Sequence, residues 1–471
     1  MIADKLRKSV LQAAIQGKLT DRRPGDGDAR DLLAEIAAEK ARLVKEGVIR
    51  RAAPLPPVGE GEAPFDIPEG WCWCTLKDIT HLVGNKNNQI QESRIMKEGK
   101  YPVVSQGQKL IDGYYDDDEK VIRDLPLVMF GDHTRNVKYI DFPFIVGADG
   151  TKFMKPIGIE PRYFYYYIYL TADILRKRGY ARHFALLKKQ IIPLPPLAEQ
   201  RRIVARLEEL LPLIEGLAQA EKELEAIERA FPDALRKALL QAAIEGKLTE
   251  REPGDGDARD LLAGIAAEKA RLVKEGVIRR TAPLPPVGED EAPFDIPEGW
   301  CWVRLGEITN YATGRQTHQK DIPAGTLIVE LEDIEKESCR LLEKHYDRTP
   351  GSSKNRFSAG DVLYGKLRPY LRKAVILNEP GYCSTEIIPF RGYGGIEAKY
   401  LMYVMISPEV DRRINSLTYG MDMPRLGRKD AVGLSIPLPP LAEQRRIVAR
   451  LEELLPLVDD LAAMEAELGA L

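Results

Sequence analysis

The chain has 471 residues, of which 44% are hydrophobic and 30% charged, and its formal net charge is −3 at pH 7. This length allows roughly three domains of about 150 residues each, while the near-neutral charge argues against a protein that coats nucleic acid with a general basic surface. No apolar run approaches the ~18 residues of a membrane span and no signal-peptide pattern opens the sequence, so we expect a cytoplasmic protein with no membrane partner.

The first predicted elements are two amphipathic helices. The stretch 6–16 has helical periodicity and is closed by Gly17, and Asp28 is placed to cap a second helix that runs to Gly47. The proline-rich run APLPPVGEGEAPFDIPEGW follows and predicts an extended path into the next part of the chain.

An α/β globule is predicted next. Short β-rich runs punctuated by glycine appear as YPVVSQG, LPLVMFGD and FPFIVGADG, and an aromatic helix extends from Tyr163 to Leu170. We interpret its tyrosines as core and helix-packing residues. Cys72 and Cys74 lack a histidine or a second cysteine pair at zinc spacing, so we interpret them as strand residues beside tryptophans.

A long helix with a coiled-coil stripe is predicted to begin at Leu197. Apolar residues alternate spacings of four and three along Ile203, Leu207, Leu210, Ile214 and Leu217, with Leu224 and Phe231 in phase. The same stripe recurs as Ile447, Leu451, Leu454, Val458, Leu461 and Leu468. We therefore expect two helices of about 30 residues and ~50 Å that pair with each other. Pro212 and Pro456 are expected to kink or interrupt them.

These elements belong to an internal duplication. Residues 6–73 return nearly unchanged as 235–302, and residues 192–213 return without a change as 436–457. Near-identical frames around unlike inserts indicate one structural role performed twice and two different roles for the inserts. The C-terminal phrase followed by the N-terminal helix resembles a cut copy of the central block, which predicts neighbouring termini and approximate twofold symmetry. The period is too long for a solenoid.

The second insert also looks like an α/β globule. Its β-rich runs are TLIVELEDI, DVLYGKL and AVIL, and an aromatic helix extends from Tyr400 to Ile406. Lys and Arg number 19 against 14 Asp and Glu over residues 75–190, and 20 against 17 over residues 303–435. The positive charge of the chain therefore lies in the two segments that are not repeated.

Catalytic signatures are missing from the sequence. QGKLT and EGKLT resemble part of a phosphate-binding loop, but Gln12 and Leu19 stand where that loop needs glycine and a hydroxyl residue, so we interpret both as helix ends. No serine-hydrolase, zinc-protease or methyltransferase motif is present. The histidines are scattered, at His81, His133, His183, His318 and His345.

The phrase PLPPLAEQRRIV at the exit of each insert, the helix LRKxxLQAAIxGKLT and the duplication together resemble the DNA-specificity subunit of Type I restriction-modification systems. The resemblance covers the whole chain. It implies an α+β protein in which two α/β target recognition domains are separated by long conserved helices that form an antiparallel coiled coil, with pseudo-twofold internal symmetry. The implied regions are 1–70 (helical region and linker), 71–191 (first recognition domain), 192–299 (central helical region and linker), 300–435 (second recognition domain) and 436–471 (C-terminal helix).

The resemblance also implies a function. Each recognition domain would recognise one half of an asymmetric bipartite site in double-stranded DNA, and the helices would set the spacer and dock methylation subunits, of which we expect two. The chain itself would be non-catalytic and hold no cofactor, since S-adenosylmethionine, ATP and Mg²⁺ are expected on partner subunits. Whether restriction subunits also bind is left open.

Base recognition needs Arg, Lys, Asn, Gln or His side chains on loops that enter a groove. Glycine-flanked loops supply such groups in both inserts. The predicted DNA contacts are Lys86, Asn87, Gln106, Gln108, His133, Arg135, Arg182, Arg315, Gln316, Lys366, Arg368, Arg372, Lys373, Arg425, Arg428 and Lys429. His133, Arg135, Arg368, Arg372 and Arg425 are the first choices among them, and for each one a solvated loop charge is the alternative.

Two other functions remain open at this point. A scaffold or antitoxin-like protein would use the coiled coil to bind proteins and would not touch DNA, so salt-sensitive and sequence-selective DNA binding separates it from a specificity subunit. A fused methyltransferase would transfer methyl groups by itself from S-adenosylmethionine, which the missing motifs argue against.

Overall fold

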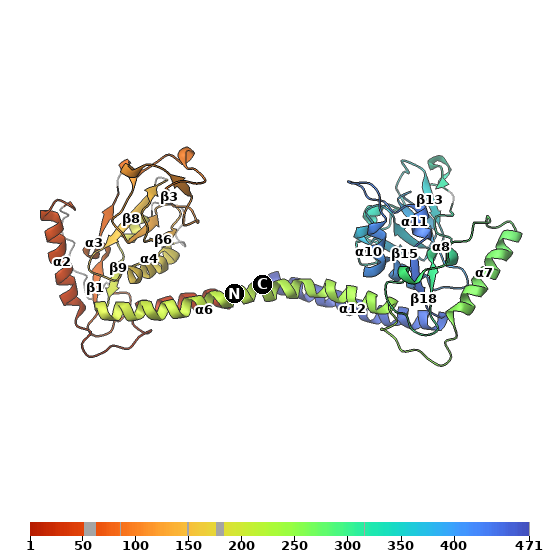
Figure 1. The fold of residues 1–471 in the computed structure, drawn as a ribbon, viewed down its shortest axis with the longest axis horizontal. Coiled ribbons are helices and arrows are strands. Elements are labelled where there is room, and N and C mark those ends of the chain that lie inside the picture. Colours follow the sequence, from red (N-terminus) through yellow and green to blue (C-terminus); the bar gives the residue numbers. More distant parts are fainter. Residues whose placement is uncertain (51–62, 85, 148–149, 176–182, 315, 471) are drawn as a thin grey trace. The chain divides into compact units, whose positions relative to one another are not determined.

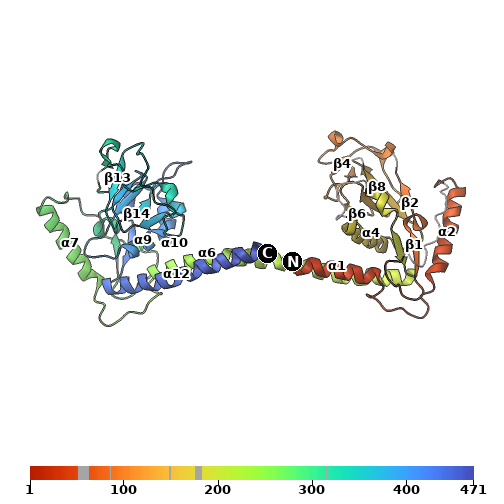
Figure 2. The same ribbon diagram turned by 180° about the vertical axis from the view of Figure 1, so that it is seen from behind.

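The computed structural model describes residues 1–50, 63–84, 86–147, 150–175, 183–314 and 316–470. The chain divides into two units, Met1–Leu224 and Glu225–Leu471, and each unit combines a helical frame with a domain that contains β-sheets (Figure 1, Figure 2). This arrangement confirms the predicted α+β class. None of the described helices is both long and apolar enough to cross a membrane.

Unit 1 begins with two helices and continues into a mixed α/β domain. Its helices and strands are α1 (Ile2–Ile15), α2 (Ala29–Lys45), β1 (Cys72–Thr75), α3 (Leu76–Ile79), β2 (Thr80–Val83), β3 (Tyr101–Val104), β4 (Gly113–Tyr115), β5 (Leu127–Gly131), β6 (Val137–Ile140), β7 (Ile145–Val146), β8 (Thr151–Pro156), α4 (Pro161–Leu175), α5 (Phe184–Leu187), β9 (Ile191–Leu194) and the first half of α6 (Leu197–Ile244). The predicted strands and the predicted aromatic helix are confirmed.

Unit 2 repeats this plan after the second half of α6. Its helices and strands are α7 (Ala258–Lys274), β10 (Cys301–Arg304), α8 (Leu305–Ile308), β11 (Gln316–Thr317), β12 (Ile328–Val329), β13 (Lys354–Phe357), β14 (Val362–Gly365), β15 (Ala374–Ile376), β16 (Gly381–Cys383), β17 (Ile387–Phe390), α9 (Ala398–Ile406), α10 (Pro408–Ser416), α11 (Arg428–Val432), β18 (Ser435–Leu438) and α12 (Leu441–Ala470).

A central strand organises the core of each domain. In unit 1, β5 lies in the antiparallel sheet β2-β8-β5-β6, and in unit 2, β14 lies in the antiparallel sheet β15-β14-β17. Side chains alternate between the faces of a strand. Val128 and Phe130 accordingly pack with α4, whereas Leu127 and Met129 pack in a separate cluster with β7 and β8. Both central strands end at a glycine, from which a loop emerges.

Each domain is closed onto its frame by a two-stranded sheet. The antiparallel pair β1-β9 aligns Cys72 with Leu194, and β10-β18 aligns Cys301 with Leu438 in the same register. These strands are the last residues of the repeated entry linker and the first residues of the repeated exit phrase. The duplicated sequence therefore joins the two ends of each insert, and Cys72 is a strand residue as predicted.

The coiled-coil stripe is buried differently from the prediction. In unit 1, Ile203 and Leu207 pack against Leu11 and Ala14 of α1, and in unit 2 the matching residues of α12 pack against the second half of α6. The two long helices α6 and α12 therefore pair as expected, but the stripe of α12 meets the second half of α6 and the stripe that begins at Ile203 meets α1. The α1–α6 pairing is antiparallel, since the start of α1 meets Glu221 whereas Leu11 and Ala14 pack with Ile203 and Leu207. The later stripe residues Leu217, Leu224 and Phe231 are exposed.

The helix α6 is longer than predicted. It spans 48 residues because it absorbs the copy of α1, whereas α12 has 30 residues. It continues through Pro212, and α12 continues through Pro456, so the expected interruption at these prolines is wrong. Both prolines are exposed, which leaves water to satisfy the carbonyl that loses its helical partner.

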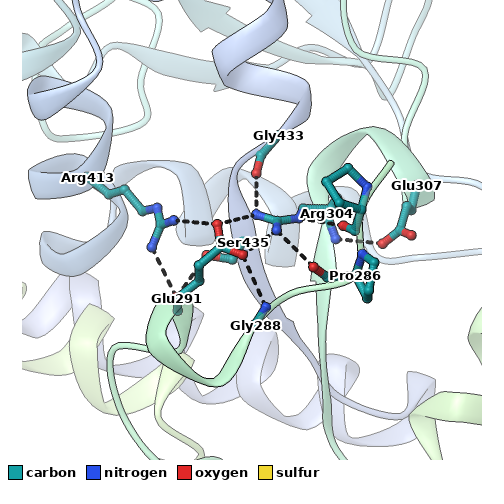
Figure 3. A network of polar contacts seen from close by, with 9 residues as sticks. Pro286, Gly288, Glu291, Arg304, Glu307, Arg413, Gly433 and Ser435 are labelled. Atoms are coloured by element: carbon teal, nitrogen blue, oxygen red, sulfur yellow. Dashed lines mark hydrogen bonds and ion pairs between the residues drawn. The ribbon is translucent and has the colours of Figure 1, made fainter. Parts of the chain in front are cut away.

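In unit 2, Arg304 fixes the proline-rich linker to the β-sheet domain (Figure 3). Arg304 is 5% exposed and donates to the carbonyl oxygens of Pro285 (3.0 Å), Pro286 (3.0 Å) and Gly433 (2.9 Å). It also donates to both carboxylate oxygens of Glu291. A guanidinium with five donors in a planar fork suits this set of acceptors.

The partner of this arginine is held from several sides. Glu291 accepts from the amide of Gly288 at 3.1 Å, and its own carbonyl accepts from Arg413 at 3.0 Å and from the Ser435 hydroxyl at 3.3 Å. The hydrogen bond from Arg304 is the main reason why the pKa of Glu291 is lowered to about 2. The linker is therefore part of the folded domain in unit 2.

Candidate nucleic-acid interface

Two predicted contact residues of unit 1 lie side by side at the ends of β3 and β5. The amide of His133 donates to Oε1 of Gln106 at 3.4 Å. The hydroxyl of Thr134 and the side-chain amide of Asn136 donate to the carbonyl oxygen of Gln106 at 2.7 and 2.9 Å. These bonds fix the loop that follows β5 against the loop that follows β3, so both strands present polar side chains at one edge.

Arg135 lies at the root of the same loop. It adopts a left-handed backbone with φ of 61°, and its Nη1 lies 3.3 Å from Nε2 of His183. His183 is fully buried, and its amide donates to the carbonyl oxygen of Asp132 at 3.1 Å. Arg135 therefore ties the loop to the segment that begins α5, and its side chain is half-buried.

Three other predicted residues of unit 1 are exposed. Lys86 and Asn87 lie in a 3-10 turn, and Gln108 lies just beyond β3. The turn is attached to the same edge, because the amide of Ile90 donates to the carbonyl oxygen of Val146 at 2.9 Å, and β7 pairs with β3.

In unit 2, two predicted residues contact Glu386 and a third contacts the neighbouring Pro424. The amide of Lys366 donates to the carbonyl oxygen of Glu386 at 2.9 Å, and Nε of Arg425 lies 3.1 Å from its carboxylate. The amide of Arg368 donates to the carbonyl oxygen of Pro424 at 2.7 Å, and its side chain is exposed. The loop after β14 and the loop before α11 thus form one polar cluster.

Three further predicted residues adjoin this cluster or follow it in the chain. Gln316 is paired with Asn355, whose side-chain amide donates to the carbonyl oxygen of Ile387 at 2.8 Å. Arg428 and Lys429 begin α11. Gln316, Arg428 and Lys429 are all exposed, so their side chains are accessible to a ligand.

Arg372 and Lys373 have structural positions instead. Arg372 is 7% exposed, pairs with Glu337, and lies 4.0 Å from Asp411. Lys373 donates to the carbonyl oxygen of Leu331 at 2.7 Å, and burial lowers its pKa. Both side chains are turned into the domain, so the structure argues against the sequence prediction for them, and we withdraw them from the proposed contacts.

Backbone register explains the position of Arg372. Gly131 and Gly365 end the equivalent strands β5 and β14. Their amides donate at 2.9 Å to the carbonyl oxygens of Asn136 and Lys373, which directly follow Arg135 and Arg372. Arg135 and Arg372 therefore occupy equivalent places, and both have positive φ, of 61° and 47°. In each unit this arginine anchors the loop, and base contact by Arg135 stays a prediction.

Two predicted contacts, Arg182 and Arg315, lie outside the described residues. For the exposed residues named above, DNA contact stays a prediction. Within the described ranges, no three His, Cys, Asp or Glu side chains gather in a way that could hold a metal ion.

Sequence reasoning missed an apolar group beside the second cluster. Tyr419, Met421 and Met423 are 61%, 102% and 45% exposed in the loop that leads to Arg425. The available signal was the run LTYGMDMP, where large apolar residues stand in a glycine- and proline-containing loop instead of a strand or helix.

Known proteins resemble this chain in sequence. The family model of the Type I restriction modification DNA specificity domain matches residues 68–226 and 297–463. The EcoAI specificity subunit of Escherichia coli is 28% identical, over 96% of this chain and 88% of its own. The EcoEI specificity subunit of Escherichia coli is 28% identical, over 97% of this chain and 90% of its own length. The crystal structure of the HsdS subunit of Thermoanaerobacter tengcongensis is 20% identical, over 86% of this chain and 95% of its own, with a TM-score of 0.43.

Each family match begins near the end of a repeated linker and extends through one insert into the helix that follows it. The two matches together cover more than half of the chain, and each contains one of the two loop clusters. The chain belongs to the Type I restriction modification DNA specificity domain family and is a specificity subunit with two target recognition domains.

Proposed function

We propose that each recognition domain binds one half of an asymmetric bipartite DNA site. The supporting observation is that two near-identical frames present unlike loop clusters, with Gln106 and His133 in unit 1 and Arg368 and Arg425 in unit 2. Glutamine pairs with adenine and arginine pairs with guanine in the major groove. Unlike side chains therefore favour unlike half-sites, and the helices α1, α6 and α12 would set the unspecified spacer between them.

The same frame helices would dock two methylation subunits. Leu213 of α6 and Leu457 of α12 occupy identical positions in the duplicated phrase and are 70% and 60% exposed. Covering an exposed leucine with an apolar surface of a partner lowers the free energy of the complex. Two identical surfaces fit two copies of one partner, and restriction subunits would join that complex.

In this proposal the chain is non-catalytic and acts in the cytoplasm. S-adenosylmethionine, ATP and Mg²⁺ would be held by the partner subunits. The lack of catalytic motifs in the sequence supports this division of labour.

A binding experiment tests DNA recognition. The full chain, purified with its methylation subunits, is titrated with duplexes from a random library, and the selected sequences are footprinted at several salt concentrations. We expect two protected half-sites and an affinity that falls steeply with salt, because phosphate contacts release counterions. An intact complex that selects no sequence would instead support a scaffold that binds only proteins.

A second experiment tests the docking surfaces. Leu213→Asp and Leu457→Asp are each expected to remove one methylation subunit, and the double variant both, as measured by native mass spectrometry. Leu342→Asp is the control, since Leu342 is 63% exposed but lies in the recognition domain. Full occupancy in the double variant would exclude this surface.

A further inference from the structure

The loop between α10 and α11 exposes large apolar side chains. Leu417, Tyr419, Met421 and Met423 are 38%, 61%, 102% and 45% exposed, and they fall within seven residues of one another. Single exposed apolar residues are common, but a contiguous exposed group indicates a binding surface. In both ribbon views this blue loop stands out from the body of unit 2 (Figure 1, Figure 2).

The loop is a narrow hairpin. The amide of Tyr419 donates to the carbonyl oxygen of Arg425 at 3.2 Å, and the amide of Arg425 donates back at 3.0 Å. Gly420 has φ of 97°, a conformation that glycine adopts without strain, and it begins the turn that places Met421 and Met423 at the tip. The two sides of the hairpin are thus held together by their backbones.

Charge is distributed along the hairpin in a way that suits DNA. Its base adjoins Lys366 and Arg368, and Arg425 is held in place by Glu386. The cations at the base suit guanine edges and phosphates, whereas the apolar tip suits neither of them. The major groove is about 12 Å wide and admits a two-stranded ribbon, and the thymine methyl is the apolar group that it displays.

We propose that this hairpin enters the major groove of the second half-site, where Met421 and Met423 pack against a thymine methyl group. Asp422, the one acidic residue at the tip, would accept a hydrogen bond from the amino group of a neighbouring cytosine. The inference rests on the proposed DNA recognition and adds to it the hairpin residues and the base that they contact. It concerns unit 2 alone.

The test combines a protein change with a base change. The probe is the duplex selected by the wild-type complex, and each thymine of the second half-site is replaced in turn by deoxyuridine, which lacks the methyl group. We expect Met421→Ala to weaken binding about tenfold, because it removes three heavy atoms from an apolar contact. One deoxyuridine should weaken wild-type binding by a similar factor and leave the Met421→Ala complex unchanged.

Controls separate the possible failures. Leu342→Ala changes another large apolar residue of unit 2, which is 63% exposed and lies outside the hairpin, and it should bind DNA like the wild type. The contact would be overturned if every deoxyuridine weakened the Met421→Ala complex by the same factor as the wild-type complex. It would also be overturned by a second half-site without thymine, or by normal DNA affinity of Met421→Ala. If the wild-type complex prefers no sequence, the proposed function itself fails.

Discussion

The repeated frames of units 1 and 2 make the same contacts. Nε1 of Trp71 donates to Glu199 at 2.9 Å, and Nε1 of Trp300 donates to Glu443 at 2.8 Å, with both tryptophans buried. Further along, an arginine of α6 and one of α12 each pair at 2.6 Å with a buried aspartate that precedes α2 or α7, and each pair lowers the pKa of its aspartate. Identical sequence has thus produced identical packing twice.

The units differ where the frame meets the insert. At equivalent positions unit 1 has Thr75 and unit 2 has Arg304. The amide and hydroxyl of Thr75 donate to Asp78, and Thr75 pairs with Ile191 in the sheet β1-β9. Arg304 holds the proline-rich linker through Pro285, Glu291 and other acceptors, whereas the matching linker of unit 1 lies outside the described residues. The comparison shows that the frame is constant, while the fastening of the linker in unit 2 depends on a residue of the variable domain.

The largest expected effect comes from breaking the shared contact in one unit at a time. Trp71→Ala and Trp300→Ala should each cost about 3–5 kcal/mol of stability, because a buried aromatic ring is lost and a carboxylate loses its donor. Hydrogen exchange measured by mass spectrometry should show lost protection only in the unit that carries the change. Equal loosening of both units by either variant would contradict two independent cores.

A smaller effect should follow from Arg304→Met, which removes the fastening of the unit 2 linker. We expect amide exchange over residues 284–292 to accelerate about tenfold or more, because several hydrogen bonds are lost together. Arg304→Lys, which keeps the charge but not the planar fork, should recover only part of the protection. Unchanged exchange in Arg304→Met would show that packing alone holds the linker.

Acid should weaken the same fastening. An unfolded glutamate has a pKa of about 4.3, whereas the pKa of Glu291 in the folded linker is about 2. At a pH between these two values, Glu291 is protonated in the unfolded linker but not in the folded linker. The stability of the folded linker is therefore full above the higher pKa and falls as the pH decreases toward 2. Exchange over residues 284–292, corrected for its intrinsic pH dependence, should rise in this window, and Arg304→Met should abolish the rise.

The smallest effect should be equal in the two units. The side chains of Asp28 and Asp257 cap α2 and α7 by accepting from the amides of Arg30 and Arg259 at 2.8 and 2.7 Å. Asp28→Ala and Asp257→Ala should each cost about 1 kcal/mol, measured as faster exchange in the first turn of the helix. A clear difference between them would mean that the frames are less alike than their sequences.

Much of the fold could be predicted because local signals were strong. The cap at Asp28, the ends at Gly17 and Gly246, the aromatic helices and the central strands depend on nearby residues, and the structure has them as expected. The partner of each stripe could not be predicted in the same way. An apolar stripe shows which face is buried but not which helix covers it, and the copy of α1 offered an equally suitable partner.

The candidate site shows a similar limit. Glycine-flanked cations correctly located the loops around Gln106 and Arg368, since such loops emerge at strand ends. The sequence could not show that Glu337, 35 residues away, would pair with Arg372 and draw it inward. It also did not distinguish an exposed methionine at a hairpin tip from a core methionine, because composition is the same in both cases.

The most direct test of the central claim is a map of methylated adenines in cells that express the chain with its methylation subunits. The map is compared between the wild type, a Gln106→Ala/His133→Ala variant and an Arg368→Ala variant, with Arg271→Ala on α7 as a control. We predict a split asymmetric motif in which the first variant relaxes one half only and Arg368→Ala relaxes only the other. Relaxation of the same half by both variants, or no motif despite an intact complex, would contradict the assignment of one half-site to each domain.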